Sequence, residues 1–328
     1  MKIFEPHPTE RDEVIQKTKD EMAVVQNLKI EAIPTYYEFV EDATWTKRNG
    51  TSKQVSYLLM ENCQGVELIE FLNQSKRQDD VFVRYIFHQI AKALHELHRA
   101  GVAHRDIKPE NIILTENFDI KLIDLGYGIS LSGRVQDGFN RTTLGTPMYM
   151  APEIVNKQPY QGSDVDLFAF GVTLMVARLV AYPFNQACLT DEKYKLLCGA
   201  DSHLFWKGYK KSIPGLSDEF VNLITGMLQL NPASRPSMAD VLGHPWMRGE
   251  TVTPEAFNSH CAEFMNKAKL DRVAEQEATG IDYSIPQSQG RARRGGADAS
   301  EGYTFDTDFY MNHSFKPPVQ QRLGEKST

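Results

Sequence analysis

His104-Arg105-Asp106-Ile107-Lys108-Pro109-Glu110-Asn111 is the stretch that decides the fold, and Asp124-Leu125-Gly126 follows it after a short interval. Phosphoryl transfer leaves a protein little covalent work, so catalysis consists of aligning a hydroxyl with a phosphate and neutralising the charge that spreads. Asp106 can accept the proton of an attacking hydroxyl, and Lys108 can follow the phosphoryl group as a flexible point charge. Asn111 and Asp124 offer the oxygen ligands that Mg²⁺ prefers. An ordinary charged loop is the alternative, but five fixed residue types at this spacing arise by chance with odds on the order of one in ten thousand.

These residues resemble the catalytic loop and the metal-binding triplet of the eukaryotic protein kinases. Lys108 resembles the serine/threonine branch, and Gly145-Thr146-Pro147-Met148-Tyr149-Met150-Ala151-Pro152-Glu153 is similar to the end of the family's activation segment. Leu125 stands where the family usually has Phe, and it keeps an apolar side chain there. The overall pattern is most similar to the calcium/calmodulin-dependent group. The resemblance implies an enzyme that transfers the γ-phosphate of Mg-ATP to serine and threonine hydroxyls of protein substrates.

Composition and charge agree with a globular enzyme. A chain of 328 residues with 41% hydrophobic content can bury one large core or two lobes. The net charge of -7 argues against nucleic-acid binding. The four cysteines show no paired metal spacing, which is typical of free thiols in a reducing compartment, and we expect a cytoplasmic protein. The apolar run from Leu167 to Phe184 contains Arg178, so it predicts a buried helix rather than a membrane span.

The resemblance predicts an α+β fold class, a bilobal protein-kinase-like fold with a truncated small β-rich lobe and a mainly α-helical large lobe. We expect the small lobe at residues 1–61 and the large catalytic lobe at 62–248. A helical extension at 249–282 and a disordered tail at 283–328 complete the predicted organisation.

The first helix of the chain carries a candidate site residue on its apolar face. Thr9 is a possible cap, and the helical pattern runs from there to about Lys29. Glu21 falls on the same face as the apolar residues, which is costly for a carboxylate unless a cation meets it. Lys2-Ile3-Phe4 resembles the third strand of a kinase small lobe, whose lysine pairs with the helix glutamate and holds the nucleotide phosphates. The alternative is an exposed Glu21 with Met22 on the core side.

If Lys2 is that lysine, the chain begins in the middle of a small lobe, and Gly-x-Gly-x-x-Gly does not occur before it. Met1 is then either an internal methionine of a longer product or the start of a natural short form. The missing glycine-rich loop motivates a second hypothesis, a catalytically weak or inactive kinase-like interaction module. Against that hypothesis, each recognised catalytic position in the chain still carries a competent residue.

Two further strands lead to a predicted nucleotide-binding hinge. Residues 33–40 and 54–60 alternate or run apolar like strands, separated by a turn signal around Asn49-Gly50. By resemblance, Met60 is the gatekeeper, Glu61 and Cys63 offer backbone groups to adenine, and Glu67 binds ribose or a basic substrate residue. The alternative is that Met60 and Cys63 are ordinary core residues at a strand end.

The large lobe is predicted to be mainly helical. Residues 81–99 form an amphipathic helix that Gly101 terminates, and residues 111–114 and 120–123 form a hairpin with Asn111 and Asp124 at its open end. The resemblance places Asp166 against the backbone of the catalytic loop. It also makes Glu153 and Arg235 a buried structural ion pair.

The activation segment between Asp124 and Glu153 contains two candidate regulatory residues, Thr142 and Thr143. A phosphate on Thr142 can dock on Arg105 through charge-assisted hydrogen bonds, with Lys17 as a second candidate partner. One departure from the family is Ile129, where a basic residue is common. An unmodified polar loop is the alternative.

The partners that the sequence predicts are protein substrates with Ser or Thr acceptors. Glu67 and Glu110 match acids that receive a basic residue upstream of the acceptor in arginine-directed relatives, although Val176 stands at a third position that is acidic in those relatives. Residues 254–278 are predicted to form a helix that docks on the large lobe, and acids such as Glu263 argue against calmodulin binding. The cluster of Arg291, Arg293 and Arg294 is either a nuclear address or a solvated linker.

Overall fold

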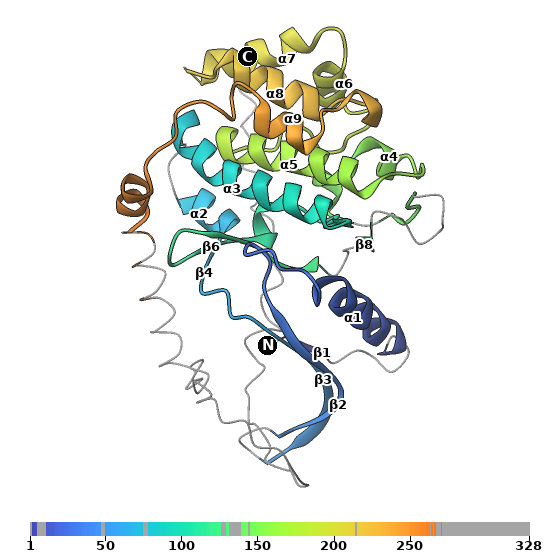
Figure 1. Ribbon diagram of the computed structural model, residues 1–328. Helices are drawn as coiled ribbons and strands as arrows, with labels where there is room; N and C mark the ends of the chain where they lie inside the picture. The colour runs from blue at the N-terminus through green and yellow to red at the C-terminus, as the bar shows by residue number, and fades with distance from the viewer. Residues whose placement is uncertain are drawn as a thin grey trace, which may run out of the picture.

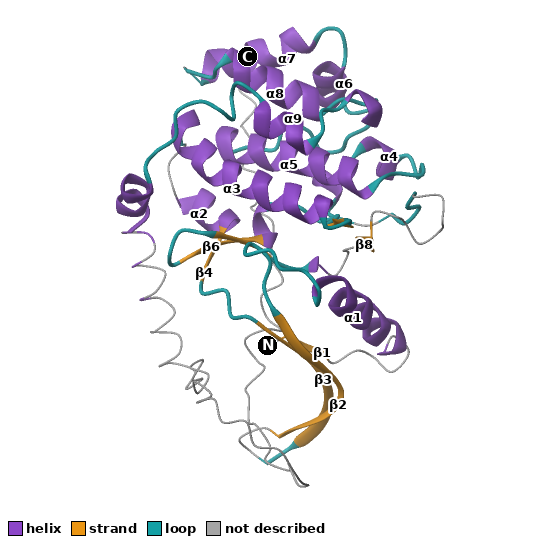
Figure 2. Cartoon of the chain, in the orientation of Figure 1, coloured by secondary structure: helices purple, strands orange, loops and turns teal. Residues whose placement is uncertain are grey.

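The computed structural model divides the chain into a small group of strands with one helix and a larger, mainly helical group (Figures 1 and 2). It describes residues 2–4, 11–46, 50–74, 78–125, 129–130, 139–143, 145–213 and 215–262, together with 264, 266 and 270. Within these residues, no helix is both long enough and apolar enough to cross a membrane. The predictions for Thr9, for residues 283–328 and for the arginine cluster fall outside the described residues.

The first group is an antiparallel sheet with a helix packed beside it. Its strand order is β1-β3-β2, which makes β3 the central strand. Its members are β1 (Lys2–Phe4), α1 (Arg11–Val25), β2 (Tyr36–Thr46) and β3 (Ser52–Met60). The strand predicted around Lys2 is present, and Lys2 lies opposite Leu58 of β3.

Two boundaries in this group differ from the prediction. Helix α1 ends at Val25 instead of Lys29, because Leu28 N–H bonds to the carbonyl of Val25 and tightens the chain into a turn. Strand β2 begins at Tyr36 rather than at residue 33, since Pro34 lacks an N–H for the ladder and the Ile33 N–H is used in a turn with Ile30.

Two short sheets open the second group. One has the order β4-β6-β7 and the other pairs β5 with β8, all antiparallel. The strands are β4 (Gly65–Glu67), β5 (Val102–Ala103), β6 (Ile112–Thr115), β7 (Ile120–Leu122) and β8 (Ile129–Ser130). The predicted hairpin is therefore confirmed as β6–β7, and its pairing of Ile112 with Leu122 puts Asn111 and Asp124 at its open end.

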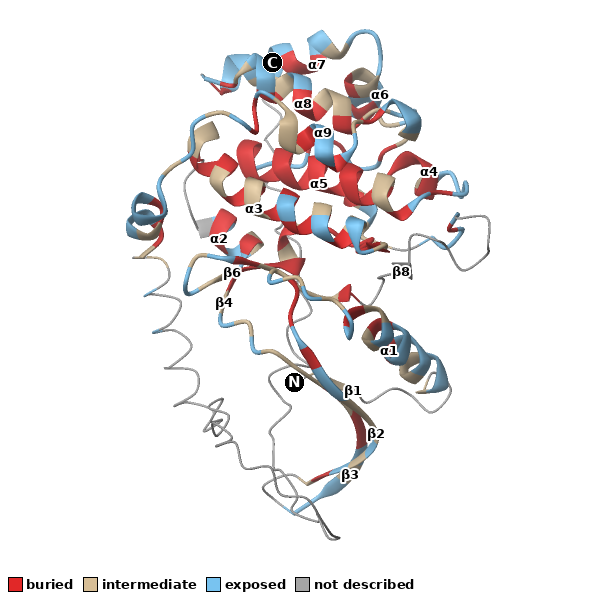
Figure 3. Cartoon of the chain, viewed as in Figure 1, coloured by how far each residue is buried: buried red, intermediate tan, exposed pale blue. Residues whose placement is uncertain are grey.

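The helices of the second group pack around α5, which is buried along nearly its whole length (Figure 3). The group contains α2 (Leu68–Gln74), α3 (Asp80–Arg99), α4 (Pro152–Val155), α5 (Gly162–Leu179), α6 (Glu192–Cys198), α7 (Ser202–Ser212), α8 (Asp218–Met227) and α9 (Met238–Gly243), with 3₁₀ turns η1 (Pro109–Asn111), η3 (Pro147–Tyr149) and η4 (Pro232–Ser234). Helix α3 confirms the amphipathic pattern, with Asp79 as its cap and Gly101 following its end at positive φ. This α+β arrangement confirms the predicted fold class.

The described part of the C-terminal extension is helical at residues 254–262. Phe257 is fully buried, and its ring stacks on Phe82 of α3 at 4.7 Å between centroids. Phe264 packs edge-on against Phe71 of α2 at 5.3 Å. The predicted docking of this segment on the large lobe is confirmed for these residues.

Candidate active site

A buried carboxylate of α5 sets the backbone of the catalytic loop. Asp166 is fully buried, and its two oxygens accept hydrogen bonds from the backbone N–H groups of His104 (2.8 Å) and Arg105 (2.6 Å). Arg105 has φ of 66°, a left-handed conformation that a residue with a side chain adopts only when its surroundings hold it there. Asp166 therefore lies where the sequence placed it, and its two bonds fix the turn that presents Asp106.

The side chain of Asp106 is the centre of a cluster of polar groups. Lys108 Nζ lies 2.8 Å from Asp106 Oδ2, and Asn111 Nδ2 donates to the same oxygen at 2.8 Å. Thr146 Oγ1 donates to Asp106 Oδ1 at 3.4 Å and accepts from Lys108 Nζ at 2.9 Å. The structure thus brings together the three predicted loop residues. Thr146 was missed, although it stands in the activation-segment motif that the sequence displays.

Asp124 lies at the end of β7, joined to the loop by backbone contacts. Ile123 N–H donates to the carbonyl of Asn111 at 2.9 Å, and the Ile123 carbonyl lies 3.1 Å from His104 Nε2. Leu125 is fully buried, so it fills the apolar position predicted for it. Of the two predicted metal ligands, Asn111 is buried and Asp124 is partly exposed.

The residues present fit a magnesium ion that is shared with a phosphorylated substrate. Because Asn111 Nδ2 is directed at Asp106, the amide oxygen Oδ1 is the atom of that side chain able to bind a cation. Mg²⁺ usually takes one or two carboxylates and completes its shell with phosphates and water, so a set of Asn111 and Asp124 suffices. No cluster of three or more His, Cys, Asp or Glu side chains suited to a metal occurs in the described part of the chain.

Lys2 departs from its predicted partner. Its Nζ forms an ion pair with Asp124 Oδ1 at 3.1 Å instead of with Glu21. Glu21 is buried, as predicted, and its Oε1 accepts a hydrogen bond from the Tyr36 hydroxyl at 2.6 Å. Burial raises the pKa of Glu21, and the nearby Lys2 charge partly opposes this rise. Glu21 is therefore stabilised both by the nearby charge of Lys2 and by the hydrogen bond from the Tyr36 hydroxyl, although Lys2 forms its ion pair with Asp124.

The predicted hinge is tied to both groups of the fold. Glu61 N–H donates to the Thr35 carbonyl at 2.7 Å, and the Glu61 carboxylate pairs with Lys121 of β7 at 2.7 Å. Burial opposes ionisation of Glu61, but the bonds from Lys121 and Thr35 outweigh it and lower its pKa. Met60 packs against the core, and burial raises the pKa of the half-buried Cys63 thiol to about 11. The N–H of Glu61 is therefore engaged, and adenine binding by its carbonyl and by Cys63 stays a prediction.

Two acidic side chains, Glu67 and Glu110, lie close to each other at the catalytic loop. Burial, then the charges of Glu70 and Glu110, raise the pKa of Glu67, while Lys108 opposes the rise. Burial also raises the pKa of Glu110. The Oε2 atom of Glu110 is buried and has no hydrogen-bond partner in the described structure. Such an oxygen is costly to leave unpaired, so the group is suited to a cation supplied from outside.

The activation segment contacts the catalytic loop through Arg105. Its Nη1 donates to Thr142 Oγ1 and to the Tyr160 hydroxyl, both at 3.2 Å. Thr142 and Thr143 are exposed. The hydroxyl of Thr142 therefore lies beside a guanidinium as predicted, and phosphorylation of either threonine stays a prediction.

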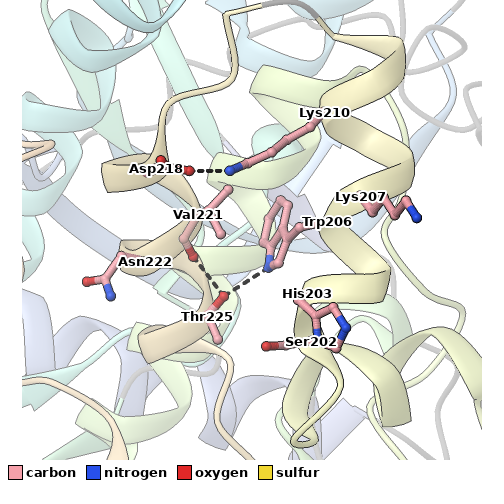
Figure 4. Close-up of a pocket in the computed structure, with 9 residues that line it drawn as sticks. All are labelled: Ser202, His203, Trp206, Lys207, Lys210, Asp218, Val221, Asn222 and Thr225. Carbon is pink, nitrogen blue, oxygen red and sulfur yellow. Dashed lines mark hydrogen bonds and ion pairs between the residues drawn. The ribbon is translucent and has the colours of Figure 1, made fainter.

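The fold contains a larger cavity away from the predicted site residues and a smaller one lined in part by them. A cavity of about 590 Å³ lies between α7 and α8, and Figure 4 shows its floor, where Trp206 Nε1 donates to Thr225 Oγ1 at 3.0 Å and Lys210 pairs with Asp218. Its nine lining residues include none of the predicted site residues. A smaller cavity is lined by Asp106, Gly145 and Thr146, among others. We therefore take the region around Asp106 as the candidate active site.

Comparisons with known proteins identify the family of the chain. The family described as "Protein kinase domain" matches residues 1–247. CBL-interacting protein kinase 10 of Oryza sativa subsp. japonica is 31% identical over 248 residues, which cover 76% of this chain and 51% of that protein. CBL-interacting serine/threonine-protein kinase 10 of Arabidopsis thaliana is 32% identical over 248 residues, or 76% and 48% of the two chains. Maternal embryonic leucine zipper kinase of Danio rerio is 30% identical over 278 residues, 84% of this chain and 37% of that protein. The chain spans about half the length of the plant relatives, and less of the fish relative.

Proposed function

The chain belongs to the protein kinase family, in its serine/threonine branch, and we propose that it transfers the γ-phosphate of Mg-ATP to serine and threonine hydroxyls of proteins. The observation that carries this proposal is the cluster of Lys108, Asn111 and Thr146 around the buried Asp106, with Asp124 joined to it through the backbone. In an ordinary charged surface loop the side chains are solvated, and so many polar groups do not converge on one buried carboxylate.

Each side chain of the cluster has a role in this reaction. Asp106 accepts a hydrogen bond from the substrate hydroxyl and takes its proton as the oxygen attacks. Lys108 lies 2.8 Å from Asp106, close enough for its charge to stabilise the transferred phosphoryl group. Asn111 and Asp124 would hold Mg²⁺, which neutralises charge on the phosphates when it is bound. Lys2 and Glu21 would complete the phosphate side of the site, and Met60, Glu61 and Cys63 the adenine side.

Replacing Asp106 by Asn tests the chemistry. The amide keeps the size of the side chain but cannot take a proton, so we expect kcat to fall by about 10²- to 10⁴-fold. Transfer of labelled phosphate from Mg-ATP to a serine peptide measures this loss. Asp119→Asn is the matched control, because Asp119 is an exposed carboxylate in the turn of the β6–β7 hairpin.

Asp106→Asn protein that transfers phosphate as fast as the unchanged chain would contradict the mechanism. An unchanged chain that binds Mg-ATP in a thermal-shift titration but transfers nothing would favour the alternative, a kinase-like interaction module.

The acidic group points to the class of substrate. The charge of Glu110 adds to the cost of ionising Glu67, and Glu110 itself carries a buried oxygen without a hydrogen-bond partner in the described structure, so an arginine or lysine upstream of the acceptor would relieve both. We expect Glu110→Gln to lower kcat/KM for a basic peptide about tenfold, the equivalent of about 1.4 kcal/mol, and to leave a neutral peptide unaffected. Glu116→Gln, an exposed position, is the control. A peptide array that shows no preference for upstream charge would remove this part of the proposal.

A further inference from the structure

We propose that the Tyr36 hydroxyl is a positioning group, which holds Glu21 and helix α1 in place while Lys2 engages Asp124. This inference deepens the proposed function, because Glu21 and Lys2 are active-site residues only if the chain binds Mg-ATP.

Tyr36 and Glu21 form a buried contact between two elements of the small group. Tyr36 is the first residue of β2 and lies opposite Met60 of β3. Its hydroxyl donates to Glu21 Oε1 at 2.6 Å, and the two residues are only 6% and 5% exposed. Burial, then the Glu21 charge, raise the pKa of Tyr36, so the hydroxyl keeps its proton and remains a donor. The bond therefore joins a protonated phenol to a carboxyl group with little access to water, so its loss would leave a buried acceptor without this partner.

Helix α1 has few other buried contacts through which it could be held. Its buried residues are Thr18, Glu21 and Val25, and most of its remaining side chains face solvent (Figure 3). The Thr18 hydroxyl bonds within the helix, to the Val14 carbonyl. Glu21 is thus the buried side chain of α1 that reaches a side chain of the sheet by a hydrogen bond. Lys19 and Arg11 also reach β2, but through ion pairs with Glu41 and Asp42 that are exposed to water and contribute less. Loss of the Tyr36 bond should therefore loosen the helix.

The ion pair of Lys2 with Asp124 explains why Glu21 needs a hydrogen bond from Tyr36. Lys2 and Asp124 have side chains that are each 42% exposed, so their ion pair is accessible to water and contributes little stability. Lys2 can therefore exchange partners at low cost, whereas the buried Glu21 cannot lose its donor without a penalty. Because Tyr36 supplies that donor, helix α1 stays docked whichever carboxylate Lys2 contacts. The lysine is then available to nucleotide phosphates without releasing the helix.

Hydrogen exchange of the unliganded chain tests the holding role directly. Tyr36→Phe removes only the hydroxyl, and we expect amides of residues 11–25 to exchange about fivefold or more faster. Tyr37→Phe is the matched control, because Tyr37 is the next residue of the strand and is 58% exposed. Equal exchange in the two variants would overturn the proposal, whatever the enzyme assays show.

Steady-state kinetics with Mg-ATP then tests whether the hydroxyl acts through Glu21. We expect Tyr36→Phe to lower kcat/KM for ATP about tenfold, Glu21→Ala to lower it at least as much, and the double variant to lose no more than Glu21→Ala alone. Additive losses, or a Tyr36→Phe protein with unchanged kcat/KM, would overturn the positioning role. If the unsubstituted protein transferred no phosphate, that result would contradict the proposed function instead. The exchange experiment would still decide whether Tyr36 holds the helix.

Discussion

At the scale of single residues, the guanidinium of Arg235 is buried and paired through each of its three nitrogens. It forms a double ion pair with Glu153 at 2.7 and 2.8 Å and donates to the carbonyls of Gln229 and Asp164. Phe168 lies under it at 5.0 Å from the ring centroid. The resemblance predicted this ion pair, and the structure confirms its geometry. Its role is structural, since it joins the end of the activation segment to the last turns of the fold.

Removing one charge from this pair should be strongly destabilising. Glu153→Gln leaves a buried guanidinium beside a neutral amide, so we expect the free energy of unfolding to fall by about 3 kcal/mol or more. Urea unfolding followed by circular dichroism measures the change. Glu219→Gln, which removes an exposed carboxylate of α8, should change it by less than about 0.5 kcal/mol. A loss below about 1 kcal/mol in Glu153→Gln would show that the pair contributes little.

At the scale of elements, one carboxylate joins three helices. Asp80 begins α3 and accepts hydrogen bonds from Arg178 of α5 (2.6 Å), from the Ser217 hydroxyl that caps α8 (2.7 Å) and from Trp246 Nε1 (3.0 Å). Burial works against ionisation of Asp80, but these bonds outweigh it and lower its pKa. Ionised Asp80 therefore stabilises the packing of α3 on α5 and α8.

This arrangement predicts both a loss of stability and a change in its pH dependence. Asp80→Asn should lower the free energy of unfolding at pH 7 by about 2 kcal/mol or more, because Arg178 then loses its charged partner. Since the folded pKa of Asp80 is depressed, its contribution is present above the unfolded pKa of about 3.9 and is lost as pH falls through the folded value. The free energy of unfolding should therefore fall less between pH 7 and a pH below 4 in Asp80→Asn than in the Asp119→Asn control. Parallel pH curves would contradict this account.

At the scale of the whole molecule, the sequence predicts best what short segments determine. Helix α3 and the β6–β7 hairpin follow from local periodicity and turn residues, and both are present within a residue or two of their predicted ends. The start of β2 was misplaced because the apolar pattern from residue 33 outweighed Pro34, whose effect on the strand ladder is local and could have been used.

The residues of the candidate site also differ in whether the local sequence predicts their contacts. The loop residues Asp106, Lys108 and Asn111 are close in sequence, so their grouping could be predicted from the motif. The partner of Lys2 could not, because Asp124 is 122 residues away and the choice between two carboxylates depends on tertiary packing. Tyr36 gives no local signal, since an aromatic residue at a strand start is ordinary and only the folded chain brings its hydroxyl to Glu21.

The three strands β4, β6 and β7 carry the two candidate chemistries on one small sheet. Glu67 ends β4 opposite Ile113, whereas Asn111 and Asp124 lie just outside the paired ends of β6 and β7. A slip of one residue in this sheet turns every side chain to the opposite face, so it would displace Glu67 and the candidate metal ligands together. The turn at residues 116–119 lies outside the paired strands, so changes there need not alter this register.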